Sequence, residues 1–195
     1  MRLWVDAHMD SILEHASGIR DWLQRSPVGH ADLPRLMEAG IRLQVLAHHV
    51  TPTGSPGHSL SRVLHLLAHS HRLLRDQRVH LVKTADDLRV IVDQDRLGLL
   101  LGLEGGECIG DDPLLLESLF ALGIRLFSPV WNERNSLADG ALFMSNAGLT
   151  RQGRETIRLA ARLGMIIDVS HLNYTGFWQV LEECPHPIIA SHSNA

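Results

Sequence analysis

The sequence predicts an α/β fold built on a parallel sheet. Two observations carry this prediction. Short apolar runs, nearly continuous in aliphatic residues as in strands buried on both faces, occupy residues 2–6, 41–47, 97–103, 123–130, 164–170 and 186–192. Amphipathic stretches with helical spacing alternate with them, at residues 11–24, 32–38, 59–76, 85–95, 113–121, 148–163 and 175–183. Strand and helix alternating about six times predicts parallel strands, in either a doubly wound sheet or a (β/α)8 barrel.

Local signals support the helix ends. Thr84 precedes "ADDL" and is a good N-cap, with acidic residues in the first helical turn. Gly40, Gly123 and Gly164 follow three of the helical stretches, in the position where a left-handed residue commonly ends a helix. These signals place several of the helix ends within a residue or two.

Composition limits the class of protein. The 195 residues are 45% hydrophobic and 21% charged, which is typical of one globular domain covering residues 1–195. A net charge of -4 without basic clusters argues against nucleic-acid partners. The two cysteines, Cys108 and Cys184, are too few for a disulfide framework and fit a reducing cytoplasm. No apolar run reaches the length of about 18 residues that a membrane span needs, so we expect no membrane segment.

Polar residues at the strand ends favour the barrel. Five residues of metal-ligand type follow four of the predicted strands: His8 and Asp10, Glu104, His171, and His192. In a doubly wound sheet, strand ends that are far apart in the strand order would not meet at one point. The carboxyl-terminal mouth of a barrel brings such ends together, and active sites of barrel enzymes lie there.

These five residues suit a pair of divalent ions such as Zn²⁺. His8 and Asp10 would bind one ion and His171 and His192 the other, and Glu104 would bridge the two and act as the catalytic carboxylate. Lys83, the only lysine, lies before a helix and away from any strand end, so a modified lysine cannot be the bridge. A bridged pair about 3.5–4 Å apart would activate water as hydroxide.

Other polar residues receive lesser roles. Asp6 and Asp168 lie close to predicted ligands in the sequence and would orient them. His48 and His49 follow the second predicted strand, so one of them could enter the mouth. His65 and His69 have the i, i+4 spacing that can bind zinc, but helical spacing alone is a weak motif, so we expect their side chains to be solvated or to cap a helix end.

Six segments resemble, in order, the membrane (renal) dipeptidase family of zinc peptidases. They are "DAHMD", "ADLPRLMEAGIRLQVLA", "LGLEGGECIG", "WNERNSLADG", "GLTRQGRETIRLAARLGMIIDVSH" and "PIIASHSNA". The resemblance covers essentially the whole chain and implies a (β/α)8 barrel that holds two zinc ions and cleaves dipeptides. It implies that Glu104 is shared between both ions, with His8 and Asp10 on one and His171 and His192 on the other.

Two departures from that family shape the expectations. The best-known members carry a substrate-binding histidine after the fourth predicted strand, where this chain reads "SPVWNERN", so Trp131 and Asn132 are the candidates for substrate contact. The family also continues beyond "SHSNA" through two further strands that carry a functional arginine and aspartate. We therefore expect an incomplete barrel with about six of eight strands, truncated at its C-terminal end, with open strand edges through which copies could associate as a homodimer.

Three functions follow from the sequence. The first is a zinc metallo-dipeptidase whose substrate is a small dipeptide. The second is another metal-dependent barrel amidohydrolase, against which the His-x-Asp pattern at the first strand argues. The third is a metal-binding but inactive fragment, because the expected truncation would remove residues that position a dipeptide.

Overall fold

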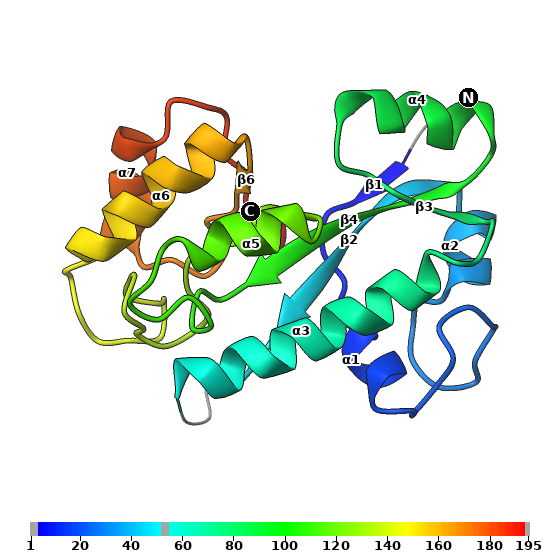
Figure 1. Cartoon of the computed structure of the whole chain (residues 1–195), viewed down its shortest axis with the longest axis horizontal. Helices are drawn as coiled ribbons and strands as arrows, with labels where there is room; N and C mark the ends of the chain where they lie inside the picture. The colour runs from blue at the N-terminus through cyan, green and yellow to red at the C-terminus, as the bar shows by residue number, and fades with distance from the viewer. Residues whose placement is uncertain (1–3, 52–54, 194–195) are drawn as a thin grey trace. The chain divides into compact units, whose positions relative to one another are not determined.

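The computed structural model describes residues 4–51 and 55–193 (Figure 1). The strands are β1 (Trp4–Asp6), β2 (Ile41–His49), β3 (Val79–Leu81), β4 (Leu97–Glu104), β5 (Ile124–Ser128) and β6 (Ile166–Ile167). The helices are α1 (Ser11–Ala16), α2 (Leu33–Glu38), α3 (Pro56–Leu73), α4 (Ala85–Asp93), α5 (Leu115–Ala121), α6 (Arg151–Leu163) and α7 (Tyr174–Glu183). Two compact units divide the chain: a first unit of Met1–His48 with Leu64–Leu101, and a second of His49–Val63 with Gly102–Ala195.

The first unit contains parallel strand pairs. β1 pairs with β2 and β3 pairs with β4, both parallel. Every residue of β4 is buried, as its uninterrupted apolar run "LGLLLGL" predicts. The core side chains that are almost completely buried include Trp22, Leu33, Leu46, Leu97 and Leu99.

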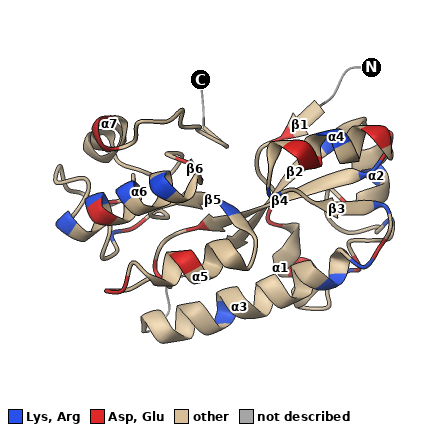
Figure 2. Cartoon of the chain, turned by 45° about the horizontal axis from the view of Figure 1, so that its top comes forward, with Lys and Arg blue, Asp and Glu red and all other residues tan. Residues whose placement is uncertain are grey.

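The second unit repeats the arrangement. β5 pairs in parallel with β6, with Leu126 opposite Ile166. Phe127, Ile157 and Val180 are fully buried in its core. Ion pairs join α6 and α7, because Arg154 and Arg158 on α6 bind the two carboxylate oxygens of Glu183 on α7 at 2.7 and 2.6 Å. Figure 2 shows basic residues along α6 and an acidic segment on α7.

The structure corrects the sequence prediction at three points. The helix expected over 11–24 ends at Ala16, because Gly18 takes a left-handed φ of 71° and closes the turn with a hydrogen bond from its N–H to the His15 carbonyl. The three-residue strand β3 was not predicted, since so short a segment carries no periodic signal.

The last predicted strand, 186–192, is the third correction. Only Ile189 forms a strand-type bridge, a parallel one to Asp168, with hydrogen bonds from Ile189 to Ile167 and from Val169 to Ile189. Pro187 lacks an N–H and cannot donate to a strand ladder, which limits pairing in this segment. The segment still runs beside β6, and this places His192 near the end of that strand.

The α/β class with parallel strands is thus confirmed. Of the predicted first strand, residues 2 and 3 lie outside the described residues. In the part of the chain that is described, no helix is both long and apolar enough to span a membrane. Both cysteines are buried and neither forms a disulfide.

Candidate metal centre

Glu104 is the last residue of β4, and its position is fixed by the chain that follows. Gly105 has a φ of +93°, a left-handed conformation that lets the strand turn sharply. A Cβ on Gly106 would lie 2.8 Å from the carbonyl oxygen of Pro129, so only glycine fits against the neighbouring segment. The Glu104 side chain is only 6% exposed. A nearly buried carboxylate at a strand end requires a partner.

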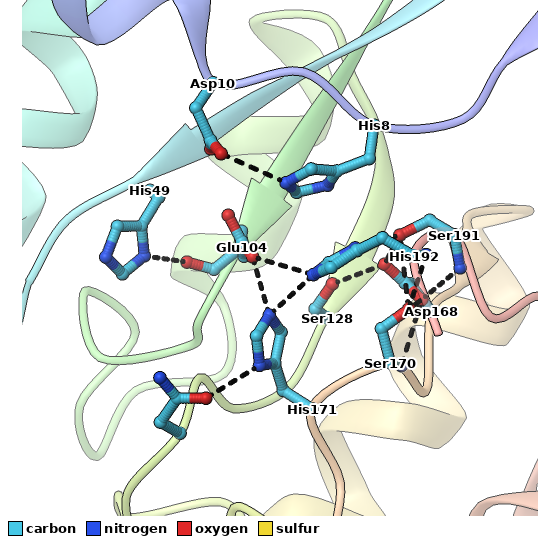
Figure 3. A network of polar contacts seen from close by, with 11 residues as sticks. His8, Asp10, His49, Glu104, Ser128, Asp168, Ser170, His171, Ser191 and His192 are labelled. Carbon is cyan, nitrogen blue, oxygen red and sulfur yellow. Dashed lines mark hydrogen bonds and ion pairs between the residues drawn. The ribbon is translucent and has the colours of Figure 1, made fainter. Parts of the chain in front are cut away.

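Two histidines from later strand ends supply that partner. Nε2 of His171 lies 2.8 Å from Oε1 of Glu104, and Nε2 of His192 lies 3.5 Å from the same oxygen (Figure 3). The two Nε2 atoms are 2.8 Å apart. The three predicted ligand atoms in the second unit therefore converge on one point.

This donor set fits a divalent metal ion. One proton can form a hydrogen bond between only two of these three atoms. A metal cation can accept a lone pair from each of them. Two imidazole nitrogens and a carboxylate oxygen are a usual zinc set, with bonds of about 2.0–2.2 Å. On the chemistry of these residues, zinc or a similar ion would be held by Glu104, His171 and His192.

Asp168 orders the segments that carry both histidines. Its carboxylate is buried and accepts hydrogen bonds from the hydroxyl groups of Ser128, Ser170 and Ser191, at 3.0, 2.6 and 2.5 Å. The backbone N–H groups of Ser170 and Ser191 donate to the same carboxylate at 3.1 Å each. Burial alone would raise the pKa of Asp168, but the hydrogen bonds from Ser170 and Ser191 outweigh it and hold that pKa below its usual range.

The serines link this carboxylate to the metal ligands. Each precedes a histidine directly, in the repeated "SH" of "DVSH" and "ASH". The Ser170 hydroxyl also accepts a hydrogen bond from the backbone N–H of His192 at 3.1 Å. Asp168 therefore orders the backbone next to His171 and His192, through serines that the sequence analysis did not single out.

The side chain of Asn132 contacts His171, one of the predicted metal ligands. Its Oδ1 lies 3.1 Å from Nδ1 of His171, so the ring donates its Nδ1–H to the amide and keeps Nε2 toward Glu104. Partners of this kind fix the tautomer of a metal-bound histidine. The predicted substrate contact of Asn132 is untested; the observed contact gives it an orienting position.

Trp131 lies between two imidazoles. Its ring centroid is 4.5 Å from that of His49 and 6.3 Å from that of His171. Nδ1 of His49 lies 3.3 Å from the backbone carbonyl of Glu104. Of the two histidines after the second predicted strand, His49 is therefore the one near the metal centre, while buried His48 binds the Ser70 hydroxyl at 2.8 Å in the first unit.

Glu107 is a residue that the sequence analysis overlooked. Burial raises the pKa of its carboxyl, although a hydrogen bond from the Asn135 amide, at 3.2 Å, partly offsets the effect. The only sequence signal was the second glutamate of "EGGE", three residues after Glu104.

The first unit holds the other two predicted ligands. Nε2 of His8 lies 3.4 Å from Oδ2 of Asp10, directly after β1. The carboxylate of Asp6 accepts a hydrogen bond from the backbone N–H of His8 at 3.1 Å, and its orienting role stays a prediction. A hydrogen bond from Ala47 to the Met9 carbonyl ties this segment to β2. The side chains of His8 and Asp10 are thus adjacent, and backbone hydrogen bonds hold the segment that carries them.

Replacing Asn132 by Ala should lower the affinity for zinc about 10–100-fold, because His171 would lose the group that fixes its tautomer. Asn132→Asp keeps an oxygen acceptor and should restore most of the affinity. Equilibrium dialysis with zinc measures the effect, and Asn146→Ala, at an exposed asparagine, is the control. Wild-type affinity in Asn132→Ala would show that the contact is dispensable.

The chain is similar to known dipeptidases and metallopeptidases. The sequence profile of the membrane dipeptidase family (peptidase family M19) matches residues 2–195. An uncharacterised protein of the PQQ-III 3' region of Acinetobacter calcoaceticus is 29% identical over the whole chain, which covers 67% of that protein. Human dipeptidase 3 is 28% identical over 86% of the chain, which covers 35% of that relative.

Solved structures of metallopeptidases are similar as well. A metallopeptidase from Rhodobacter sphaeroides, liganded with a phosphinate mimic of the dipeptide L-Ala-D-Ala, superposes with a TM-score of 0.89 at 26% identity over 97% of this chain. A metallopeptidase named dipeptidase AC gives a TM-score of 0.88 at 27% identity over 97% of this chain. The chain spans 64% and 62% of these proteins, respectively. The expected fold class, an incomplete (β/α)8 barrel, is confirmed, and the chain belongs to the membrane dipeptidase family of metallopeptidases.

Proposed function

We propose that this chain carries the metal-binding part of a zinc-dependent dipeptidase that hydrolyses the peptide bond of small dipeptides. The convergence of Glu104, His171 and His192 within 3.5 Å of one another is the observation that carries the proposal. The phosphinate dipeptide mimic bound to the Rhodobacter sphaeroides relative supports the substrate class.

The proposal includes two zinc ions bridged by Glu104. His171 and His192 would hold one ion, and His8 with Asp10 would hold the other. His8 and Asp10 lie side by side and offer one nitrogen and one oxygen ligand, which suits the same kind of ion. A carboxylate has two oxygens, so Glu104 can serve both ions at once.

The residues of the chain then have distinct tasks. When bound, the ions would supply Lewis-acid chemistry by acidifying water and polarising the scissile carbonyl. Glu104 holds negative charge at the centre. Asn132 keeps the proton of His171 on Nδ1, so that Nε2 offers a lone pair. Trp131, beside His49 and His171, gives the centre an aromatic wall against which a dipeptide side chain could pack.

A hydrolysis assay tests the proposal directly. The purified 195-residue chain, loaded with zinc, should cleave L-Ala-D-Ala or another dipeptide, and a chelator should abolish the cleavage. The same assay on acetylated and amidated dipeptides separates a dipeptidase from a general amidohydrolase, since a dipeptidase should require free ends. Zinc binding without cleavage of any dipeptide would favour the metal-binding but inactive alternative.

A further inference from the structure

A second group of imidazoles lies in the first unit and shares no residue with the metal centre. His65 and His69 are one helical turn apart on α3, with ring centroids 4.7 Å from each other. His15, at the end of α1, brings a third ring to within 5.7 Å of His69. Figures 1 and 2 both show α1 beside α3. The fold thus places a third imidazole, from another helix, beside the i, i+4 pair.

The surroundings of His69 favour its neutral form. Burial, and then the neighbouring charges of His65, Arg72 and His15, lower the pKa of His69 below its usual value. A neutral imidazole has a free lone pair, whereas a protonated one has none. His69 is therefore ready to act as a ligand at neutral pH.

The carboxylate of Asp21 lies near the third ring, that of His15. Oδ1 of Asp21 lies 3.7 Å from Nδ1 of His15, and the backbone N–H of Trp22 donates to the same nitrogen at 3.3 Å. If Nε2 of His15 bound an ion, the ring proton would move to Nδ1, where Asp21 can accept it and the long Trp22 contact would be given up. Carboxylates in this position are the usual outer partners of metal-bound histidines.

We propose that His15, His65 and His69 form a binding site for a divalent transition-metal ion, such as Zn²⁺, Cu²⁺ or Ni²⁺. Imidazoles suit these ions, and bonds of about 2.0–2.1 Å place two nitrogens on one tetrahedral ion roughly 3.3–3.5 Å apart. The ring centroids of His65 and His69 are 4.7 Å apart and those of His15 and His69 are 5.7 Å apart, so rotation of these side chains would have to bring their nitrogens together around the ion. His65 is exposed and His69 is partly buried, so water can complete the coordination.

The site would tie α1 to α3. An ion that binds only the folded first unit stabilises it by mass action, by about 2.7 kcal/mol at a metal concentration 100 times the dissociation constant. The site therefore gives the first unit a metal-dependent stability that needs none of the residues of the Glu104 centre.

Equilibrium dialysis with Zn²⁺ alone tests the site in the full chain. The double variant His65→Ala/His69→Ala should bind one zinc ion fewer than the wild type. His15→Gln should lower the affinity for that ion at least about tenfold. His58→Ala removes an exposed histidine from the same helix and is the matched control. Circular dichroism checks that each variant is folded; His65 is exposed, so its replacement should not unfold α3.

Two further readouts separate this site from the other centre. Cu²⁺ bound to the wild type should show nitrogen hyperfine structure in electron paramagnetic resonance, and the double variant should lose one such signal. Dipeptide hydrolysis at saturating zinc should be equal in the wild type and the double variant. Equal zinc stoichiometry and affinity in wild type, double variant and control would overturn the proposal, whatever the outcome of the hydrolysis assay.

Discussion

Replacing Glu104 by Gln should remove zinc from the second unit and lower any dipeptide hydrolysis by more than about 100-fold. The amide has nearly the shape of the carboxylate but carries no negative charge, and its NH₂ group cannot bind a cation. Loss of a mere orienting partner costs 10–100-fold in metal affinity or activity, so loss of a shared ligand should cost more. Metal analysis of dialysed protein should show the zinc content of Glu104→Gln falling below that of the wild type by up to two ions, the pair assigned to this centre.

The control for this change is Glu117→Gln, at an exposed glutamate on α5. It makes the same chemical substitution away from the histidines and should leave zinc content and hydrolysis unchanged. The free energy of unfolding of the metal-free Glu104→Gln protein should stay within about 1 kcal/mol of the wild type, because the volume is kept. A zinc content and a zinc affinity in Glu104→Gln equal to those of the wild type would rule out the bridge.

Replacing Asp168 by Ala should lower the free energy of unfolding of the metal-free protein by about 3–5 kcal/mol. Three hydroxyl groups and two backbone N–H groups would lose their common acceptor, and most of these donors are shielded from water. Zinc affinity should fall as well, since the serines beside His171 and His192 would no longer be held. Urea unfolding and dialysis measure the two effects.

Two further variants test whether the loss of stability comes from the hydrogen bonds to Asp168. Asp168→Asn keeps one oxygen acceptor but turns an NH₂ group toward the donors, so its effect should be intermediate. Asp111→Ala, at an exposed aspartate of the same unit, should change the unfolding free energy by less than about 0.5 kcal/mol. If Asp168→Ala were as stable as Asp111→Ala, the hydrogen bonds to Asp168 would have no net effect on stability.

The contribution of Asp168 should also depend on pH. Its pKa in the folded protein is lower than the unfolded value of about 3.9, so its stabilising effect is complete above that value. The effect is lost as the pH falls through the lower, folded-state pKa, because the protonated carboxyl gives up part of its hydrogen bonding. The difference in urea midpoint between the wild type and Asp168→Ala should therefore be constant from pH 7 to about pH 5 and shrink at lower pH.

The sequence by itself determined the features that depend on neighbours along the chain. The continuous apolar run of β4 predicted a buried strand, and the glycines after α2, α5 and α6 predicted where those helices end. Metal-ligand residue types at successive strand ends predicted the convergence of Glu104, His171 and His192, because parallel strands place their carboxyl ends at one edge.

The tertiary structure alone decided the contacts between residues far apart in the chain. Asn132 lies 39 positions before His171, and Ser128 lies 40 positions before Asp168, so no local pattern links them. The ring of His15 meets that of His69 only because α1 packs beside α3. Periodicity reports which face of an element is buried, whereas the partner of a polar side chain is set by which elements the fold brings together.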